Sequence, residues 1–138
     1  MNPIEKYFSG GCSISLENVT YNKLDEIDDE VSLSVKDNLE IKEDHSSNNI
    51  ELLISRHLTF EPKSLVDINV SFGVVMELDS KFKGDTQLDH ELLKKELLNN
   101  DNVIMPIIMS RISLLISQLT SSYGERPIIT PPTFMITD

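Results

Sequence analysis

Hydrophobic and polar residues alternate along the first half of the chain, and alternation with a period of two predicts β-strands. The clearest run extends from Val66 to Leu78. One of its faces carries only apolar side chains, namely Val66, Ile68, Val70, Phe72, Val74, Met76 and Leu78. An alternation of this length is typical of a strand with one buried face, and we expect such a strand here.

Three earlier stretches, residues 13–21, 31–41 and 50–60, alternate less regularly and predict three more strands. In the first, the apolar face changes phase between Leu16 and Val19, which predicts a β-bulge. In the second, Asp37 and Asn38 break the pattern, and we expect an interruption there. Short turn-forming segments at 43–49 and 61–64 separate the later strands and favour antiparallel pairing.

After residue 79 the spacing of apolar residues changes to that of helices. A short helix is predicted, with Asp85 or Thr86 as its N-cap. Its apolar positions are Leu88, Leu92, Leu93 and Leu97. A longer helix is predicted from about residue 102 to residue 123, with Pro106 near its first turn and Gly124 after its end.

The two ends of the chain follow neither period. Residues 1–12 contain Gly10 and Gly11 and are expected to form a flexible arm. Residues 125–138 hold Pro127, Pro131 and Pro132 among apolar residues, which predicts an extended segment with little conformational freedom. A tail this apolar is expected to lie on the rest of the protein.

Strands that precede helices indicate the α+β class. We therefore expect a four-stranded antiparallel sheet with the two C-terminal helices packed on one of its faces. The chain shows no internal repeat and no linker, and its 138 residues suit a single domain spanning 1–138.

The chain carries a net charge of −11, which argues against nucleic acid and anionic membranes as partners and is compatible with a basic protein partner. Its one cysteine, Cys12, cannot form an internal disulfide, and the first residues do not read as a signal peptide. The most apolar stretch, 103–119, contains Arg111 and is not expected to span a membrane. A soluble cytoplasmic protein is the expectation.

Motifs for catalysis are missing: there is no Gly-rich phosphate loop, no HExxH and no GxSxG. No enzyme activity, cofactor or metal site is therefore predicted, and structural or surface roles are expected for His45, His57 and His90. An acidic cluster lacks the spacing of a calcium loop and is either a solvated loop or a docking patch for a basic partner. Its members are Asp25, Glu26, Asp28, Asp29 and Glu30.

The longer helix is apolar around more than one stripe, and one sheet cannot cover all of that surface. The surplus needs another subunit, a bound client or the tail. Self-association into a homo-oligomer, a dimer or tetramer, is the preferred answer, because symmetric oligomers commonly bury such surface.

Several residues of the C-terminal third occur in a familiar order. Pro106 and Arg111 lie in the long helix, Gly124 follows it, and Pro131 and Phe134 end the apolar segment. Together with the strand around Gly73, this pattern resembles the SecB export chaperone family over about residues 13–136. The match is poor at residues 19–25, and Asn69 stands where the family has an acid, which bears on docking to a translocase motor.

The resemblance implies a holdase chaperone that binds unfolded or partly folded polypeptide in apolar grooves, without ATP. Two dimers would pack through helices into a tetramer, with a role in protein transport. Clients would lie between the sheet and the segment after the long helix. The candidate client-binding residues are Phe72, Val74, Met76, Pro127, Ile128, Ile129, Pro131 and Phe134.

A second hypothesis keeps the same fold and gives it one dedicated protein partner. Such a protein would be a toxin–antitoxin-associated chaperone or a phage or host regulator. The departures from the family pattern motivate this alternative, and neighbouring genes or binding to unrelated unfolded proteins would discriminate between the two.

Overall fold

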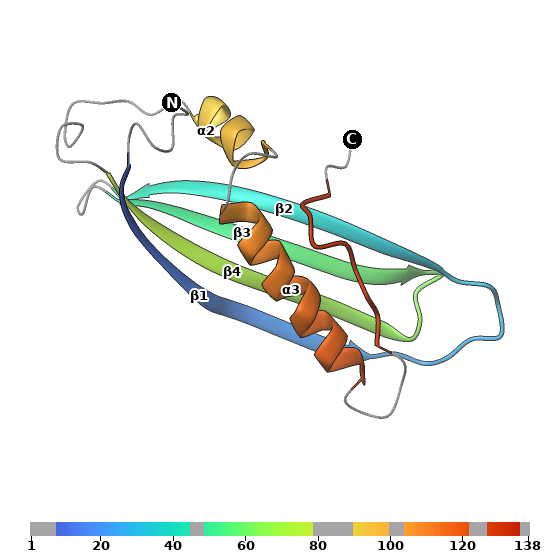
Figure 1. Ribbon diagram of the computed structural model, residues 1–138. Coiled ribbons are helices and arrows are strands. Elements are labelled where there is room, and N and C mark those ends of the chain that lie inside the picture. The colour runs from blue at the N-terminus through green and yellow to red at the C-terminus, as the bar shows by residue number, and fades with distance from the viewer. Residues whose placement is uncertain (1–7, 45–48, 79–89, 100–103, 122–126, 136–138) are drawn as a thin grey trace.

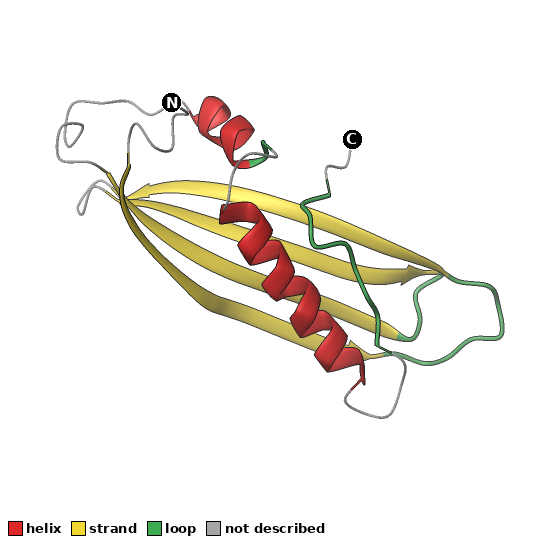
Figure 2. Cartoon of the chain, in the orientation of Figure 1, coloured by secondary structure: helices red, strands yellow, loops and turns green. Residues whose placement is uncertain are grey.

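A computed structural model describes residues 8–44, 49–78, 90–99, 104–121 and 127–135. Four strands form one antiparallel sheet: β1 (Phe8–Lys23), β2 (Ser32–Asp44), β3 (Asn49–Glu61) and β4 (Val66–Leu78). Two helices follow, α2 (His90–Leu97) and α3 (Ile104–Ser121), and residues 127–135 have no regular secondary structure (Figures 1 and 2). The predicted α+β class and the four-stranded antiparallel sheet are confirmed.

The strands are ordered β1-β4-β3-β2, so β1 and β2 occupy opposite edges although they are consecutive in the chain. The connection between them must therefore cross the full width of the sheet at one end (Figure 1). Two hydrogen bonds tie it to the β3–β4 turn: the Leu24 amide donates to the Leu65 carbonyl at 2.8 Å, and the Leu65 amide donates to the Asp25 carbonyl at 3.1 Å. These bonds hold Leu65 at a φ of 63°, a left-handed conformation that is uncommon outside glycine.

One face of the sheet is apolar and covered, and the other is polar. The alternating residues Ile50, Leu52, Ile54 and Leu58 of β3 lie opposite Met76, Val74, Phe72 and Ile68 of β4, and all eight are buried. Helix α3 and residues 127–135 cross this face (Figure 1). The period of two in the sequence therefore corresponds to a covered face and a polar face of one sheet.

The bulge predicted in β1 is confirmed. Leu16 lies opposite Phe72 and Asn18 lies opposite Ser71, so Glu17 is the extra residue. The extra residue returns Val19 and Tyr21 to the covered face, which explains the change of phase in the sequence.

Two local predictions are wrong. Strand β1 begins at Phe8, so residues 8–12 are not a loose arm; pairing with β4 orders them despite their glycines. Residues 1–7 lie outside the described part of the chain. Strand β2 runs without interruption through Asp37, because this acid has a partner on β3 that makes the covered position favourable.

Both helices lie where the sequence predicts, within a few residues. In α2, Leu93 and Leu97 are buried; the expected caps at 85 and 86 lie outside the described residues. In α3, Pro106 occupies the third position, where a missing N–H is tolerated. The buried stripe of α3 consists of Met105, Ile108, Met109, Ile112, Ile116 and Thr120. By length and composition alone α3 could cross a membrane, but this stripe packs on the sheet as in a core helix.

Candidate functional site

An ion pair is buried in the covered face of the sheet. Asp37 of β2 and Arg56 of β3 lie opposite each other, at positions that would otherwise be apolar. The Arg56 Nε donates to Asp37 Oδ1 at 2.7 Å and Nη2 donates to Oδ2 at 2.8 Å, and neither side chain is exposed. Paired hydrogen bonds of this kind fix the guanidinium plane as well as its charge.

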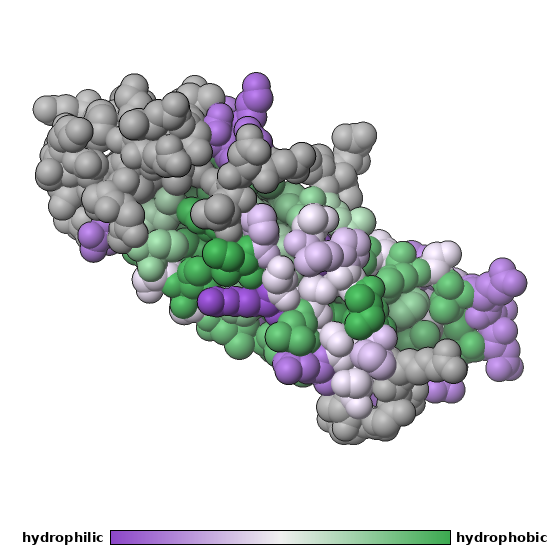
Figure 3. Space-filling model, in the orientation of Figure 1, coloured by the Kyte–Doolittle hydropathy of each residue, from purple (hydrophilic) through white to green (hydrophobic). Residues whose placement is uncertain are grey.

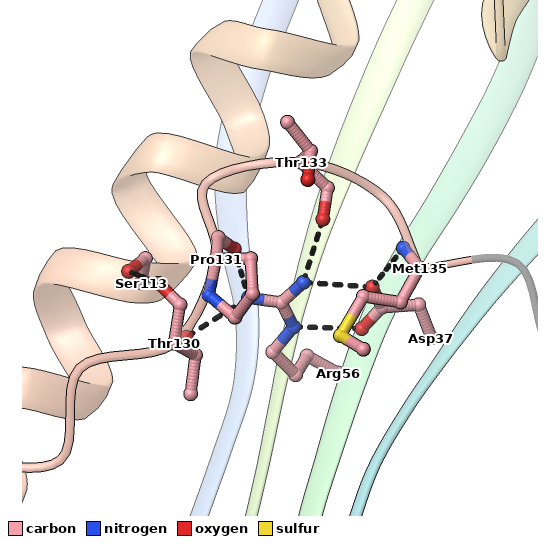
Figure 4. Close-up of polar contacts among 7 residues, drawn as sticks. All are labelled: Asp37, Arg56, Ser113, Thr130, Pro131, Thr133 and Met135. Atoms are coloured by element: carbon pink, nitrogen blue, oxygen red, sulfur yellow. Dashed lines mark hydrogen bonds and ion pairs between the residues drawn. The ribbon is translucent and has the colours of Figure 1, made fainter.

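The remaining donors of Arg56 bind residues 127–135, which we call the strap (Figure 4). Nη1 donates to Thr130 Oγ1 at 2.9 Å and to the Pro131 carbonyl at 2.6 Å, and Nη2 donates to the Thr133 carbonyl at 2.9 Å. A guanidinium has five N–H groups, and each is now used. A buried ion pair is stable only when its hydrogen-bonding capacity is met, and here the strap meets it.

The strap also donates a hydrogen bond to the ion pair. The Met135 amide donates to Asp37 Oδ2 at 2.7 Å, so both members of the ion pair contact the strap. Figure 4 shows the strap curving over the pair, with the Thr133 carbonyl and the Met135 amide pointing at it. Most of these contacts involve the strap backbone, so they fix its position rather than the identity of its side chains.

Helix α3 holds the opposite side of the strap. The Ser113 hydroxyl donates to the Thr130 carbonyl at 2.6 Å, and the Ile128 amide donates to Thr120 Oγ1 at 2.7 Å. The Thr120 hydroxyl also donates to the Ile116 carbonyl at 2.9 Å, which orients its oxygen toward the strap. The strap is thus fixed between α3 and the sheet.

An apolar hollow of about 150 Å³ lies where α2, α3 and the end of the strap meet. Its lining residues are Leu97, Leu98, Asn99, Met105, Pro106, Thr133 and Phe134. An apolar cavity of about this volume admits a benzene-sized group. The hollow can therefore take one large apolar side chain of another molecule.

Exposed apolar side chains occur on the same face of the molecule. Ile107 and Leu114 of α3 are 45% and 59% exposed, and Ile129 of the strap is 72% exposed. Figure 3 shows apolar patches over and beside α3 on this side, separated by polar and weakly polar residues, and a smaller apolar patch in the region of the strap. Together with the hollow they form an apolar surface on an otherwise acidic protein.

The eight predicted client-binding residues fall into two groups. Phe72, Val74 and Met76 are buried in the core, at 8%, 0% and 2% exposure. Their side chains therefore offer little surface for direct contact with a client. The others belong to the strap: Pro127, Ile129 and Pro131 are exposed, and Ile128 and Phe134 are half-buried. Client binding by any of them stays a prediction.

The other candidate groups lie elsewhere. The five acids between β1 and β2 are exposed, and their docking role stays a prediction. On the polar face, His57 Nε2 lies 2.8 Å from Asp67 Oδ1. Cys12 lies opposite Met76, on the covered side of β1, and partial burial raises the pKa of its thiol. Within the described residues, no group of three or more histidines, cysteines and acids could hold a metal ion. His45 and the His90 side chain lie outside that description.

A second hollow, of about 310 Å³, opens on the polar face of the sheet near the bulge. Glu17, Lys42 and Glu51 line it around Gly73. A Cβ at position 73 would lie 2.7 Å from Glu17 Oε1, so glycine leaves room for the bulged side chain. This hollow is separated from the strap by the sheet itself.

The sequence analysis did not predict that Asp37 and Arg56 position the strap. A signal was present: an acid at 37 and an arginine at 56 each occupy an apolar-face position of a predicted strand. Two opposite charges at such positions in neighbouring strands indicate a buried pair. We interpreted the first as an interruption of its strand and did not interpret the second.

The strand order, the helices on one face and the strap define a SecB-like fold. The SecB-like chaperone Rv1957 of Mycobacterium tuberculosis, solved in complex with a ChAD peptide from the Rv1956 HigA1 antitoxin, shares it with a TM-score of 0.65. That match has 12% sequence identity and covers 86% of this chain and 83% of the other. The resemblance inferred from the sequence is confirmed at the level of the fold.

A Streptococcus agalactiae protein of unknown function aligns over 88% of this chain and 99% of its own at 11% identity, with a TM-score of 0.34. No protein-family model matches the sequence. No curated protein matches it either.

Proposed function

We propose that this protein is a SecB-like chaperone that holds non-native polypeptide on the apolar surface formed by α3, the strap and the hollow. Binding would need no ATP and no catalysis. The proposal rests on the exposure of Ile129. Its side chain is 72% exposed, although hydrogen bonds to α3 and to the sheet fix the strap that carries it. An apolar group held in place and left in water loses little entropy when it binds a partner.

The shape of the apolar surface supports an extended client. The hollow accepts one side chain, and Ile129 of the strap offers a further apolar contact. Non-native chains expose such side chains, whereas folded proteins bury most of them. The lone Cys12 supports a reducing compartment, and we place the protein in the cytoplasm.

A dedicated partner is the second candidate, since the SecB-like neighbour was solved with a peptide from an antitoxin. The same surface would then bind one segment tightly in place of many weakly. Binding to several unrelated unfolded proteins favours the chaperone, and selective binding to the product of a neighbouring gene favours the dedicated partner.

Phe134→Ala tests the role of the hollow. A half-buried phenylalanine contributes apolar burial, so we expect a loss of about 1–2 kcal/mol in the free energy of unfolding. Suppression of client aggregation, followed by light scattering at equimolar protein, should fall several-fold more than this stability loss explains.

Ile14→Ala is the matched control, because Ile14 is also half-buried against the core but lies on β1 outside the hollow. It should lower stability and leave suppression unchanged. If both variants lose suppression in proportion to stability, Phe134 belongs to the core alone. If the unmodified protein suppresses no aggregation and binds no neighbouring gene product, the proposed function is wrong.

A further inference from the structure

The strap has a backbone edge that faces α3 and a second edge that faces away from it. The Ile128 amide and the Thr130 carbonyl both bond to α3, through Thr120 and Ser113. In an extended chain, the N–H and C=O groups of residues i and i+2 point to one side, and those of residue i+1 point to the other. Ile129 therefore directs its amide and carbonyl away from the helix.

Proline chemistry keeps this part of the strap extended. Thr130 precedes Pro131, and the residue before a proline is confined to extended conformations. Figure 1 shows the strap running as an extended segment beside α3. The Thr130 side chain is buried at Arg56, so the neighbouring Ile129 side chain points to the opposite side, in agreement with its exposure.

The backbone of Ile129 has no hydrogen-bond partner in the part of the chain that the structure describes. This holds for both its amide and its carbonyl. An amide and carbonyl of one residue that face the same side are the pair that antiparallel strands exchange. The strap thus carries one half of a strand-pairing unit.

The surface beside this edge is apolar. Leu33 and Phe60 lie opposite each other on the covered face of β2 and β3, beyond the ion pair, where Leu33 is 44% exposed and Phe60 is half-buried. Figure 3 shows apolar surface over this end of the sheet as well as over α3. A chain paired to the strap would find apolar contacts for alternate side chains.

We propose that an extended aliphatic polypeptide segment binds as an added strand, exchanging an amide–carbonyl pair of hydrogen bonds with Ile129. This inference rests on the proposed function and gives it a binding mode: main-chain bonds supply affinity that does not depend on sequence, and apolar contacts select aliphatic segments. The ion pair of Asp37 and Arg56 does not contact the client in this mode. It holds the strap in the conformation that presents this edge.

Amide hydrogen exchange of the intact protein tests the pairing directly. The probe is an end-blocked peptide of alternating valine and threonine. At saturating peptide, we expect exchange of the Ile129 amide to slow by about tenfold or more, since one hydrogen bond is made. The Ile128 amide, already bonded to Thr120, should not change. Saturating peptide without protection of Ile129 overturns the proposal.

Two variants separate backbone from side chain. Ile129→Pro removes the amide and keeps an extended backbone, whereas Ile129→Ala removes only side-chain contacts. We expect Ile129→Pro to weaken peptide binding about tenfold more than Ile129→Ala does. Equal losses would assign the contact to the side chain and overturn strand pairing.

Three further outcomes separate the binding mode from the proposed function. Concentration-dependent protection of Ile129 without peptide would mean that a second copy of the chain occupies the edge, and would overturn the proposal. If aggregation is suppressed and Phe134→Ala abolishes this effect while Ile129 stays unprotected, the binding mode fails and the chaperone function stands. If neither peptide binding nor suppression is seen, both fail.

Discussion

A charged pair takes the place of two core side chains at the centre of this molecule. Asp37 and Arg56 could be replaced by apolar residues without opening the sheet, because their backbones pair normally. Removing two charges from water is expensive, and buried pairs often add nothing to stability compared with apolar residues. What this pair adds is a set of donors and an acceptor that bind the backbone of a distant segment.

Asp37→Asn should destabilise the protein strongly, because it leaves a buried guanidinium without its counter-charge. We expect a loss of about 3–5 kcal/mol in the free energy of unfolding, measured by urea denaturation. The double variant Asp37→Leu with Arg56→Met should recover much of this loss, since it removes both charges.

The double variant also separates stability from strap order. The strap should lose its bonds to the sheet, so the Met135 amide should exchange faster even where stability is regained. A double variant no more stable than Asp37→Asn would show that the ion pair itself, and not the unpaired charge, supplies the stability.

At the level of elements, the strap depends on α3 as much as on the sheet. The helix presents Ser113 and Thr120 on one side, two turns apart, and the strap crosses both. Three prolines remove amides from the strap that would otherwise need partners, and they also limit the freedom lost when it is fixed. An irregular segment can therefore be ordered by few contacts.

Thr120→Val should release one end of the strap. The change keeps the side-chain shape and removes the acceptor of the Ile128 amide, at a cost of about 1–2 kcal/mol. We expect the Ile128 amide to exchange faster. Ser117→Ala is the control, because Ser117 lies on the same helix and its hydroxyl bonds to no described residue. Equal effects in both variants would mean that Thr120 acts only through helix stability.

The whole molecule combines a charge of −11 with exposed aliphatic side chains on α3. The charge keeps such a surface soluble and repels identical copies at long range. At contact, however, apolar burial outweighs screened repulsion between distant charges. Self-association through α3 is therefore our expectation, and it would cover Ile107 and Leu114 while leaving the strap available.

The molar mass in solution tests this expectation. We expect at least twice the 15.6 kDa of one chain by light scattering, and a lower mass for Leu114→Asp. Gln118→Asp adds the same charge to an exposed polar position of the same helix and should not change the mass. A mass of one chain at high protein concentration would rule out self-association through α3.

Local sequence patterns predict much of this architecture. The alternation from Val66 to Leu78 places β4, the phase change near Leu16 places the bulge, and helical spacing places α2 and α3. Such patterns are readable because the period of a strand or helix is set by its own backbone geometry. The apolar, proline-rich strap was likewise visible in the composition of the last residues.

The position of the strap was decided by contacts between distant parts of the chain. Arg56 reaches Asp37 across 19 residues and the strap across more than 70, and Ile129 is exposed only because Thr130 turns inward to Arg56. Strand order and register decide whether a buried charged residue meets an opposite charge. No single stretch of sequence contains that information. For that physical reason the elements could be predicted one by one, whereas the edge that we propose to bind a client emerged only when they were assembled.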